Sequence, residues 1–512
     1  MASDRLRDVP TIRIPLVGSL TNRDGNVTVQ TKDQLFINCF PEVVKNGVTG
    51  KASVHLLRRR GLLRPVPETW VGSTFVGDYG ACTWTGKSDG TSPSVFSFRN
   101  TSTSTVEFWS TLTGQIGGSI TTVDQCNSMT ETVVSGTSNL VAILENSTNA
   151  LQEAWYFPEG GSWTQITDSD YPSAAGLQVV GEPVHADGYM FIMGADGRIW
   201  NGDLNSLSSW AATSFITAQS IPDGGVGLAR HHDTIAAFGE FSIEFFRNAG
   251  NAIGSPLAVI KERTQRIGAK KKSAVDSCKT IHSHENDIYF LSGGGQESGD
   301  RGVYRLRDFQ VQKVSTPFID KLMDDSPILT GIAGSFRMMG MAHIMFITGA
   351  GSQHACYCPE TDTWWRWTSA TLGAPRAVLG KNNVSEFTAV GSTGGDSYVW
   401  KVDSTPGYVD NLVAFTMTIQ TMPLDFGTNR KKFFKKLELS GDQLSASGNS
   451  AVSWSNDDWA TSTSAGNVDM SVSHPMLTRL GSGRRRAFKI TDANDRPLRL
   501  EAMEITYDVG SS

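Results

Sequence analysis

Residue types that can do chemistry are present in this sequence, but no recognised catalytic motif contains them. A GxSxG nucleophile elbow, an HExxH zinc motif and a phosphate-binding P-loop are all missing from the 512 residues. Two histidine groups remain as candidates, His231 with His232 and His282 with His284. A His-x-His pair on a strand puts both imidazoles on one face, as in metal sites, yet no third ligand stands at a defined spacing. We interpret these residues as polar histidines at strand ends.

The cysteines and carboxylates also form no recognised catalytic or metal-binding motif. The six cysteines are scattered, which is typical of reduced, buried thiols: Cys39, Cys82, Cys126, Cys278, Cys356 and Cys358. The pair Cys356-Tyr-Cys358 lacks the second Cys or His pair that a metal site needs. Acidic residues are numerous enough to include a glycosidase pair, although the sequence selects none. Segment 455–461, SNDDWAT, is similar to the Asp-box turn of sialidases but lacks its glycine, so we expect a hairpin turn. We therefore expect no catalytic residue, no metal site and no cofactor.

Basic segments are the remaining candidates for a site. The run Arg58–Arg60 suits phosphate, but a solvated face or an acidic partner is the plainer interpretation. Loop 261–272, KERTQRIGAKKK, suits solvent, an acidic neighbour or DNA phosphate. The candidate interface residues are Arg58, Arg59, Arg60, Lys431, Lys432, Lys435, Lys436, Arg484, Arg485 and Arg486.

The elements that position these residues are organised around the segment 223–251, DGGVGLARHHDTIAAFGEFSIEFFRNAGN. Thr234–Phe238 is short and apolar and ends at Gly239-Glu240, and Ser242–Phe246 then alternates apolar and polar residues. Alternation of period two indicates a half-buried strand. The glycine-containing turn between two strands predicts a β-hairpin.

The same hairpin phrase recurs along the chain at intervals of roughly 40–60 residues, which is the blade period of a β-propeller. Seven copies are present, at 81–98, 140–157, 189–200, 234–246, 287–306, 343–358 and 386–402. Returning strands often end in aromatics such as Trp200 and Trp400, which suit the wedge between neighbouring blades. A sugar-binding platform is the alternative for these aromatics, and a large β-sandwich with unrelated hairpins is the alternative fold.

Length and composition are compatible with a β-propeller protein. The net charge is −6, which excludes a DNA clamp of the usual basic kind, and no run of 18 or more apolar residues occurs. The charged start, MASDRLRD, leads into no apolar stretch, so we expect no secretory signal. We predict an all-β protein with a propeller of six or seven blades and a β-sandwich-like domain. The predicted divisions are 1–62, packing with the C-terminal domain, 63–408, the propeller, and 409–512, an antiparallel β domain.

The central run 222–246 resembles the packaged-DNA stabilisation proteins of short-tailed, podovirus-type bacteriophages, also called tail hub or nozzle proteins. That family has a phrase of the form DG…G…D.I..FG..SIEyF, followed by small residues similar to 248–254. Segments 37–42, INCFPE, and 57–61, LRRRG, are similar to two N-terminal phrases of the family. The ending, with Arg485-Arg486, Phe488-Lys489 and 498–505, is also similar, although the central run is the specific part.

The resemblance implies a structural protein of the virion tail, made in the host bacterial cytoplasm and without catalytic activity. Its implied partners are itself, as a homohexamer, the portal-adaptor ring above, and a tail needle, tailspike or fibre. Packaged double-stranded DNA would pass through the channel without sequence-specific contact, which an acidic chain permits. The C-terminal domain would face the adaptor. A propeller-fold glycan hydrolase or lyase acting on bacterial surface polysaccharide is the alternative function, and a stand-alone binding propeller is a third.

Overall fold

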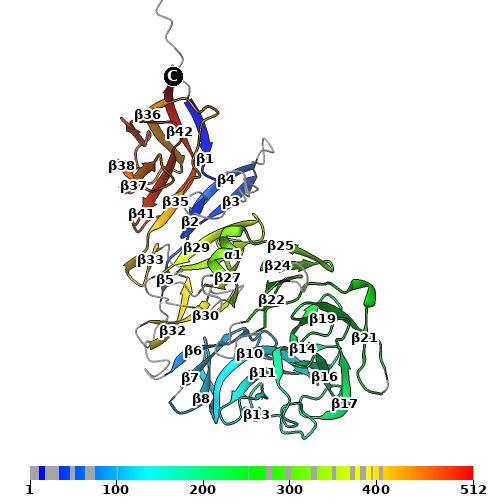
Figure 1. The fold of residues 1–512 in the computed structure, drawn as a ribbon. Helices are drawn as coiled ribbons and strands as arrows, with labels where there is room; N and C mark the ends of the chain where they lie inside the picture. Colours follow the sequence, from blue (N-terminus) through cyan, green and yellow to red (C-terminus); the bar gives the residue numbers. More distant parts are fainter. Residues whose placement is uncertain are drawn as a thin grey trace, which may run out of the picture.

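The computed structural model shows an almost entirely β protein with two connected parts (Figure 1). It describes residues 11–17, 34–45, 52–63, 75–100, 102–251, 253–271, 279–294, 301–324, 331–348, 353–369, 375–380, 388–393, 396–402 and 407–510. In the described residues, the helices are the 3-10 turn η1 (Lys261–Arg263) and α1 (Pro317–Asp324). No helix in these segments has the length and apolar character that crossing a bilayer requires.

The larger part is a β-propeller, as the sequence predicts, and the described strands form seven blades. Five blades are separate four-stranded antiparallel sheets. Blade 1 contains β6 (Val76–Thr83), β7 (Ser94–Asn100), β8 (Thr105–Ser110) and β9 (Gly114–Thr121). Blade 2 contains β10 (Val123–Val134), β11 (Thr137–Asn146), β12 (Gln152–Pro158) and β13 (Thr164–Gln165). Blade 3 contains β14 (Val179–Ala186), β15 (Tyr189–Gly194), β16 (Arg198–Gly202) and β17 (Trp210–Thr217). Blade 4 contains β18 (Gly225–His231), β19 (Thr234–Gly239), β20 (Ile243–Asn248) and β21 (Leu257–Val259). Blade 5 contains β22 (Ile281–His284), β23 (Asp287–Ser292), β24 (Gly302–Arg307) and β25 (Gln310–Lys313).

The last two blades belong to a longer sheet that continues into the smaller part of the molecule. Blade 6 contains β26 (Gly331–Met338), β27 (Met341–Ile347), β28 (Gln353–Cys358) and β29 (Thr363–Thr368). Blade 7 contains β30 (Pro375–Leu379), β31 (Thr388–Thr393) and β32 (Asp396–Val402). Its fourth strand is β5 (Leu62–Leu63), which comes from the N-terminal segment and pairs antiparallel with β32. The innermost strands contact one another around a closed ring, from β6 through β30 and back to β6.

The repeated phrase corresponds to the second and third strands of a blade, because these two strands form the most regular hairpin. In blade 4 they are β19 and β20, whose register pairs Ile235 with Phe246. The looser copy at 81–98 instead includes β6 and β7, the first and second strands of blade 1. Residues 386–387 of the last copy lie outside the described residues.

Aromatic side chains fill the wedges between blades. Phe238 of blade 4 and Phe290 of blade 5 have ring centroids 5.3 Å apart. Trp200 and Trp400 are 6% and 2% exposed, so these rings are core residues and do not form a sugar platform. Each fully buried side chain of this size contributes roughly 1.5–3 kcal/mol of hydrophobic free energy.

The smaller part, here called the terminal module, is a sandwich of strands from both ends of the chain. One sheet has the order β3-β4-β42-β36-β39, with β1 on β42 and β40 on β36. The facing layer has the order β38-β37-β41-β35-β2. The strands are β1 (Thr11–Pro15), β2 (Leu35–Ile37), β3 (Cys39–Lys45), β4 (Ala52–Arg58), β35 (Met417–Gln420), β36 (Lys432–Gly441), β37 (Asn449–Ser455), β38 (Thr463–Asp469), β39 (Met476–Thr478), β40 (Ser482–Gly483), β41 (Ala487–Asp492) and β42 (Arg499–Val509). Inward residues of both layers, such as Phe434, Ile490 and Ile505, share one core.

Strand β2 joins the two parts. It pairs antiparallel with β35 of the terminal module and parallel with β29, the outer strand of blade 6. Asn38 has φ 56° and separates β2 from β3. Pro41 lies inside β3. Proline is tolerated there because β3 is at the edge of its sheet.

A bulge changes the buried face of strand β36. Strict alternation would place Phe433, Lys435, Leu437 and Leu439 on one side. The pairing of β36 with β42 shifts register between Phe434 and Lys436. Leu437 and Leu439 are therefore buried together with Phe434, while Phe433 is 47% exposed. A bulge adds one unpaired residue and reverses the alternation beyond it.

The short hairpin β33 (Val409–Asp410) to β34 (Val413–Ala414) connects the module to blade 7.

A prediction concerns the closure of the ring by β5. A Cβ atom at Gly61 would lie 2.0 Å from the carbonyl oxygen of Val409, so the backbone must move to admit any side chain. We expect Gly61→Ala to lower the free energy of unfolding by about 2–3 kcal/mol. Urea unfolding followed by tryptophan fluorescence measures this. Gly293→Ala is the matched control, because a Cβ there meets no atom within 4 Å. Equal midpoints for the two variants would contradict the close approach.

Candidate functional site: the charged junction, the module tip and the propeller cavity

The run 222–246 in blade 4, which resembles the phage family, stabilises a turn through its own polar side chains. The Asp223 carboxylate accepts hydrogen bonds from the backbone N–H of Phe241, at 2.7 Å, and from the Ser242 hydroxyl, at 3.1 Å. A Cβ at Gly239 would lie 2.3 Å from an Asp223 oxygen, so glycine is needed at this position. The buried Glu244 carboxylate accepts hydrogen bonds from the N–H and the hydroxyl of Ser220, both at 2.8 Å. The motif thus fixes the β19–β20 hairpin.

The arginine run 58–60 provides the largest buried charges at the junction between the propeller and the terminal module. Arg58 Nη1 lies 2.6 Å from Asp492 Oδ1, and both side chains are 0% exposed. Arg58 Nη2 donates to the Phe415 carbonyl at 2.9 Å. The expectation of a solvated face is therefore wrong for Arg58, because its partner is an aspartate of the same chain.

Arg59 makes a second buried pair beside the first. Its two Nη atoms donate to the two carboxylate oxygens of Asp410 at 2.8 and 2.6 Å, a bidentate arrangement. Its Nε donates to Asn38 Oδ1 at 2.8 Å, and its guanidinium carbon lies 4.2 Å from the Trp367 ring centroid. Arg59 therefore connects the N-terminal segment, blade 6 and the start of the C-terminal segment.

Asn38 completes the junction through its amide. Its side-chain nitrogen donates to the Thr368 hydroxyl at 2.6 Å and to the Thr416 carbonyl at 2.9 Å. The two N-terminal phrases that resemble the phage family, INCFPE and LRRRG, thus meet at one buried contact between Asn38 and Arg59.

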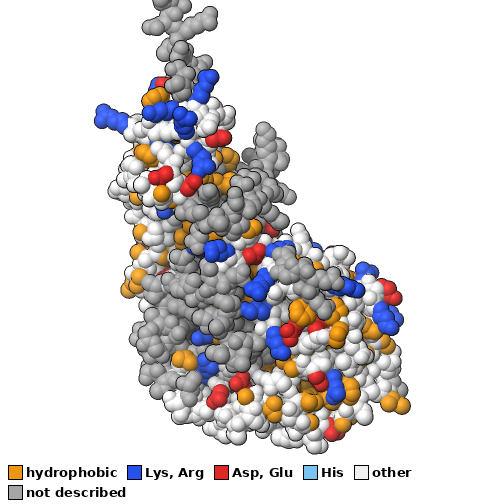
Figure 2. Space-filling view, viewed as in Figure 1, with side chains coloured by type: hydrophobic (Ala, Val, Ile, Leu, Met, Phe, Trp, Pro, Cys, Tyr) orange, Lys and Arg blue, Asp and Glu red, His pale blue; other side chains and the backbone are white. Residues whose placement is uncertain are grey.

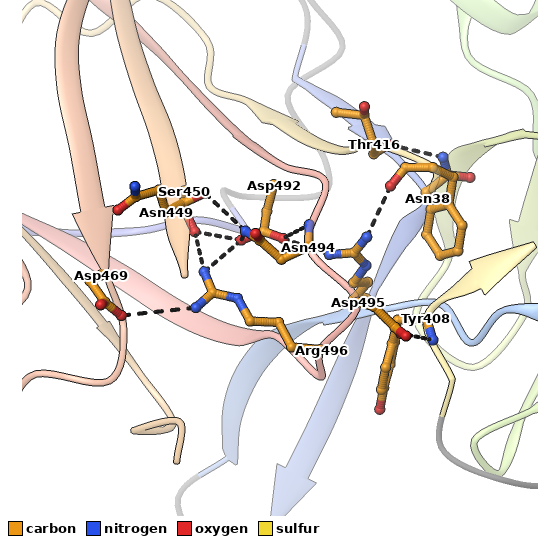
Figure 3. Close-up of polar contacts among 12 residues, drawn as sticks. Asn38, Tyr408, Thr416, Asn449, Ser450, Asp469, Asp492, Asn494, Asp495 and Arg496 are labelled. Atoms are coloured by element: carbon orange, nitrogen blue, oxygen red, sulfur yellow. Dashed lines mark hydrogen bonds and ion pairs between the residues drawn. The ribbon is translucent and has the colours of Figure 1, made fainter. Parts of the chain in front are cut away.

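Asp492 is the central acceptor of the junction (Figure 3). It accepts hydrogen bonds from the Ser450 hydroxyl at 2.8 Å, from the Asn494 backbone N–H at 2.9 Å and from Arg496 Nη2 at 2.7 Å. Burial acts to raise the pKa of Asp492, but the hydrogen bonds from Arg496 and Ser450 outweigh it and hold the pKa below its ordinary value. The carboxylate therefore stays ionised and anchors two arginines.

The structure divides the candidate interface residues into buried and exposed groups. Four of them, Arg58, Arg59, Lys432 and Arg486, are buried, so they offer no surface to a partner. Lys432 Nζ donates to the backbone carbonyls of Thr428 and Arg484 at 2.5 Å, and Arg486 stacks 3.7 Å from the Trp454 ring centroid. These cations hold the module together, and Arg60 is half-buried.

The exposed group lies around the start of β36 and the loop before β41. Lys431 and Arg484 are exposed. Lys435 pairs with Asp508 at 2.5 Å, Lys436 with Glu438 at 2.8 Å, and Arg485 with Asp458. Because Lys432 pairs with Val509 at the end of β42, this group surrounds the end of the module that carries the C-terminus, away from the propeller (Figure 1). We call Lys431, Lys435, Lys436, Arg484 and Arg485 the module tip. Figure 2 shows Lys and Arg side chains gathered at that end.

The propeller encloses a cavity of about 840 Å³ bounded by the innermost strands β10, β14, β18 and β22. Its carboxylates are engaged by donors. Glu131 accepts from the Thr85 N–H at 2.9 Å, Glu145 accepts from the Gln125 amide at 2.6 Å, and Glu182 pairs with Lys279. Lys271, from the basic loop 261–272, also borders the cavity. Residue 272 lies outside the described residues.

The described side chains contain no group of three or more His, Cys, Asp and Glu placed to hold a metal ion. His231 Nε2 accepts the N–H of Phe309 at 3.2 Å, and burial lowers the pKa of His231. Burial also lowers the pKa of His282 to about 3 and raises the pKa of Cys358 to about 12. The cysteines within the described residues are free thiols, and Cys278 lies outside them. The turn predicted at 455–461 connects β37 to β38, and Asp457 accepts the Thr461 N–H at 2.9 Å.

Fold and site together define a structural β-propeller whose distinctive polar residues brace its own turns and junctions. Comparison with protein families gives the particular group. Residues 87–327 match the family model Phage_stabilise, described as Bacteriophage P22 Gp10, beta-propeller. This match, over just under half of the chain, supports a bacteriophage structural protein that stabilises packaged DNA, and it confirms the resemblance seen in the sequence.

The matched range extends from blade 1 into the segment after blade 5. Solved structures with similar chains include BBS1N in complex with ARL6DN, at 10% identity, with 68% of this chain and 99% of that chain covered and a TM-score of 0.39. BamB from Moraxella catarrhalis has 11% identity, coverage of 78% and 97%, and a TM-score of 0.37. The computationally designed Ika8 protein has 8% identity, coverage of 67% and 100%, and a TM-score of 0.37. No curated protein matches the chain.

A prediction follows for the buried carboxylate. Asp492→Asn leaves Arg58 and Arg496 without their charged acceptor, so we expect the free energy of unfolding at pH 7 to fall by about 3–5 kcal/mol. The folded pKa of Asp492 lies below the ~3.9 of an unfolded aspartate, so its stabilisation is present above about pH 4 and is lost as the pH falls through the folded pKa. The difference between wild-type and variant urea midpoints should therefore shrink between about pH 5 and pH 2. Asp196→Asn is the control, because its pair with Arg198 is about 40% exposed and worth no more than about 1 kcal/mol. A pH-independent difference would contradict this role.

Proposed function

We propose that this protein is the tail hub, or nozzle, of a short-tailed phage particle. Six copies form a ring below the portal-adaptor complex, extend the DNA channel, retain the packaged genome and anchor a needle, tailspikes or fibres. The observation that carries the proposal is the match of residues 87–327 to the propeller family of P22 Gp10. The protein acts in the virion tail after synthesis in the host bacterial cytoplasm, and it acts without catalysis.

The size of the propeller cavity supports a ring of several copies. A volume of about 840 Å³ suits a small molecule. We therefore place the DNA channel of the proposed hub between copies of the chain, with each propeller as part of the channel wall.

The distribution of charge supports passage of DNA without tight binding. The chain has a net charge of −6, so a ring of copies repels phosphate overall. Arg58 and Arg59 are neutralised inside the chain by Asp492 and Asp410, which removes them from any contact with DNA. A channel of this kind guides DNA by shape and releases it rapidly, without sequence-specific contact.

The terminal module is proposed to face the adaptor. We assign residues 409–512 to this platform, residues 1–62 to the segment packed with it, and residues 63–408 to the propeller. The module tip lies at the end of the molecule away from the propeller and presents Lys431 and Arg484 to solvent. An adaptor with an acidic lower surface would complement this tip.

Charge reversal at the module tip tests the assignment. We expect Lys431→Glu/Arg484→Glu to reduce binding of the purified protein to portal- and adaptor-bearing particles at least ten-fold, about 1.4 kcal/mol. Both residues are exposed, so thermal stability should stay unchanged. Lys321→Glu/Arg230→Glu, with the same change in net charge at exposed propeller positions, should bind as the wild type. Bound protein per particle is measured after sedimentation. Normal binding by the tip variant would contradict the orientation, and no binding by the wild type would contradict the hub itself.

A further inference from the structure

The outer rim of four consecutive blades is uncharged. In blades 1 to 4 the outermost strands are β9, β13, β17 and β21. Each lies in a sequence run without Asp, Glu, Lys or Arg, and these runs are 108–123, 160–167, 204–222 and 248–260. In a protein with 19% charged residues, soluble surface is normally interrupted by charge more often than this. We call these four runs the neutral rim.

The neutral rim is exposed and contains prominent apolar side chains. Leu112, Leu204 and Ile253 are 55%, 56% and 90% exposed. Each lies in the loop between the third and fourth strands of its blade, in blades 1, 3 and 4. Because blades of one propeller run in the same direction, these three loops lie on the same face of the ring.

The loops of the rim are braced by their own polar groups. In the loop of blade 4, the Asn251 amide donates to the carbonyls of Ser255 and Leu257 at 3.0 and 3.3 Å, and the Gly250 N–H donates to Asn248 Oδ1 at 2.9 Å. In blade 3, the Asn205 N–H donates to the Gly188 carbonyl at 2.8 Å. Loops ordered before binding lose less conformational entropy when they dock.

Blade 5 shows that a charged rim is compatible with the same fold. Its outer hairpin, β24 to β25, contains Arg305, Arg307, Asp308 and Lys313. Arg307 is 54% exposed and pairs with Asp287 at 2.5 Å. The propeller fold therefore does not require uncharged outer strands, and the neutral rim of blades 1 to 4 needs a separate explanation.

We propose that the neutral rim is the surface through which each copy of this chain contacts the next copy in the ring. Identical chains with a net charge of −6 repel one another, and an uncharged surface is where they can meet at the lowest electrostatic cost. Subunit interfaces are depleted of Lys, Glu and Asp at their centres, as the rim is. In the proposed hub several copies enclose the DNA channel, and each copy then needs such a lateral surface. This inference rests on the proposed hub.

Added charge on the rim tests the inference. Thr213→Lys/Ile253→Lys places two ammonium groups at exposed rim positions, and Asn286→Lys/Gln310→Lys places two at exposed positions of blade 5. Both variants change the net charge equally. Full-length proteins are added to DNA-filled particles that bear the portal and adaptor but lack this protein. Copies per particle are counted by quantitative gel analysis, and ring closure is assessed by negative-stain imaging. Thermal unfolding verifies that both variants are folded.

We expect the wild type and the blade 5 variant to give equal numbers of copies per particle. The rim variant should give at least ten-fold fewer copies at the same protein concentration. Equal loading of the rim variant into closed rings would overturn the assignment. If that variant forms rings but the particles then fail to take up needle or spike proteins, the rim contacts another tail protein and not a second copy. Failure of the wild type to load would instead overturn the proposed hub and, with it, this inference.

Discussion

Two buried ion pairs hold the parts of this protein in one arrangement. Arg58 pairs with Asp492, and Arg59 pairs with Asp410, at the crossing of the N-terminal segment, blade 6 and the C-terminal strands. Burying a guanidinium without a partner costs several kcal/mol, so each pair demands that its acidic segment be in place. The same N-terminal segment supplies β2, which joins the module to blade 6, and β5, which closes blade 7. The propeller ring and the module thus depend on one connection.

Three distinctive polar residues take part in these junctions and in the turn of blade 4. Asn38, Arg59 and Asp223 are polar and distinctive, the features that often mark an active site. Each of them instead satisfies buried backbone or side-chain groups at a turn or junction. Buried polar groups must be paired, so their identity is constrained as strongly as that of a catalytic residue.

The sequence predicted the propeller well because its hairpins are local. Alternation in Ser242–Phe246 and the Gly239 turn specify β19 and β20 without help from distant residues. The seventh blade was harder to assign, because its last strand, β5, is separated from β32 by more than 300 residues and consists of two leucines. The burial of Arg58 and Arg59 was missed, because a run of arginines shows its charge in the sequence but not its aspartate partners at 410 and 492. The face of Leu437 was missed, because a single bulge between Phe434 and Lys436 reverses the alternation.

In the proposed hub the molecule is one wall of a channel, with the terminal module above and the propeller below. The most direct measurement is an electron-microscopy reconstruction of particles carrying the portal, the adaptor and this protein. The account predicts a closed ring of copies whose C-terminal strands, β36 and β42, lie against the adaptor, with DNA on the ring axis and outside every propeller. Single copies at the end of a spike, or rings with the propeller against the adaptor, would contradict it.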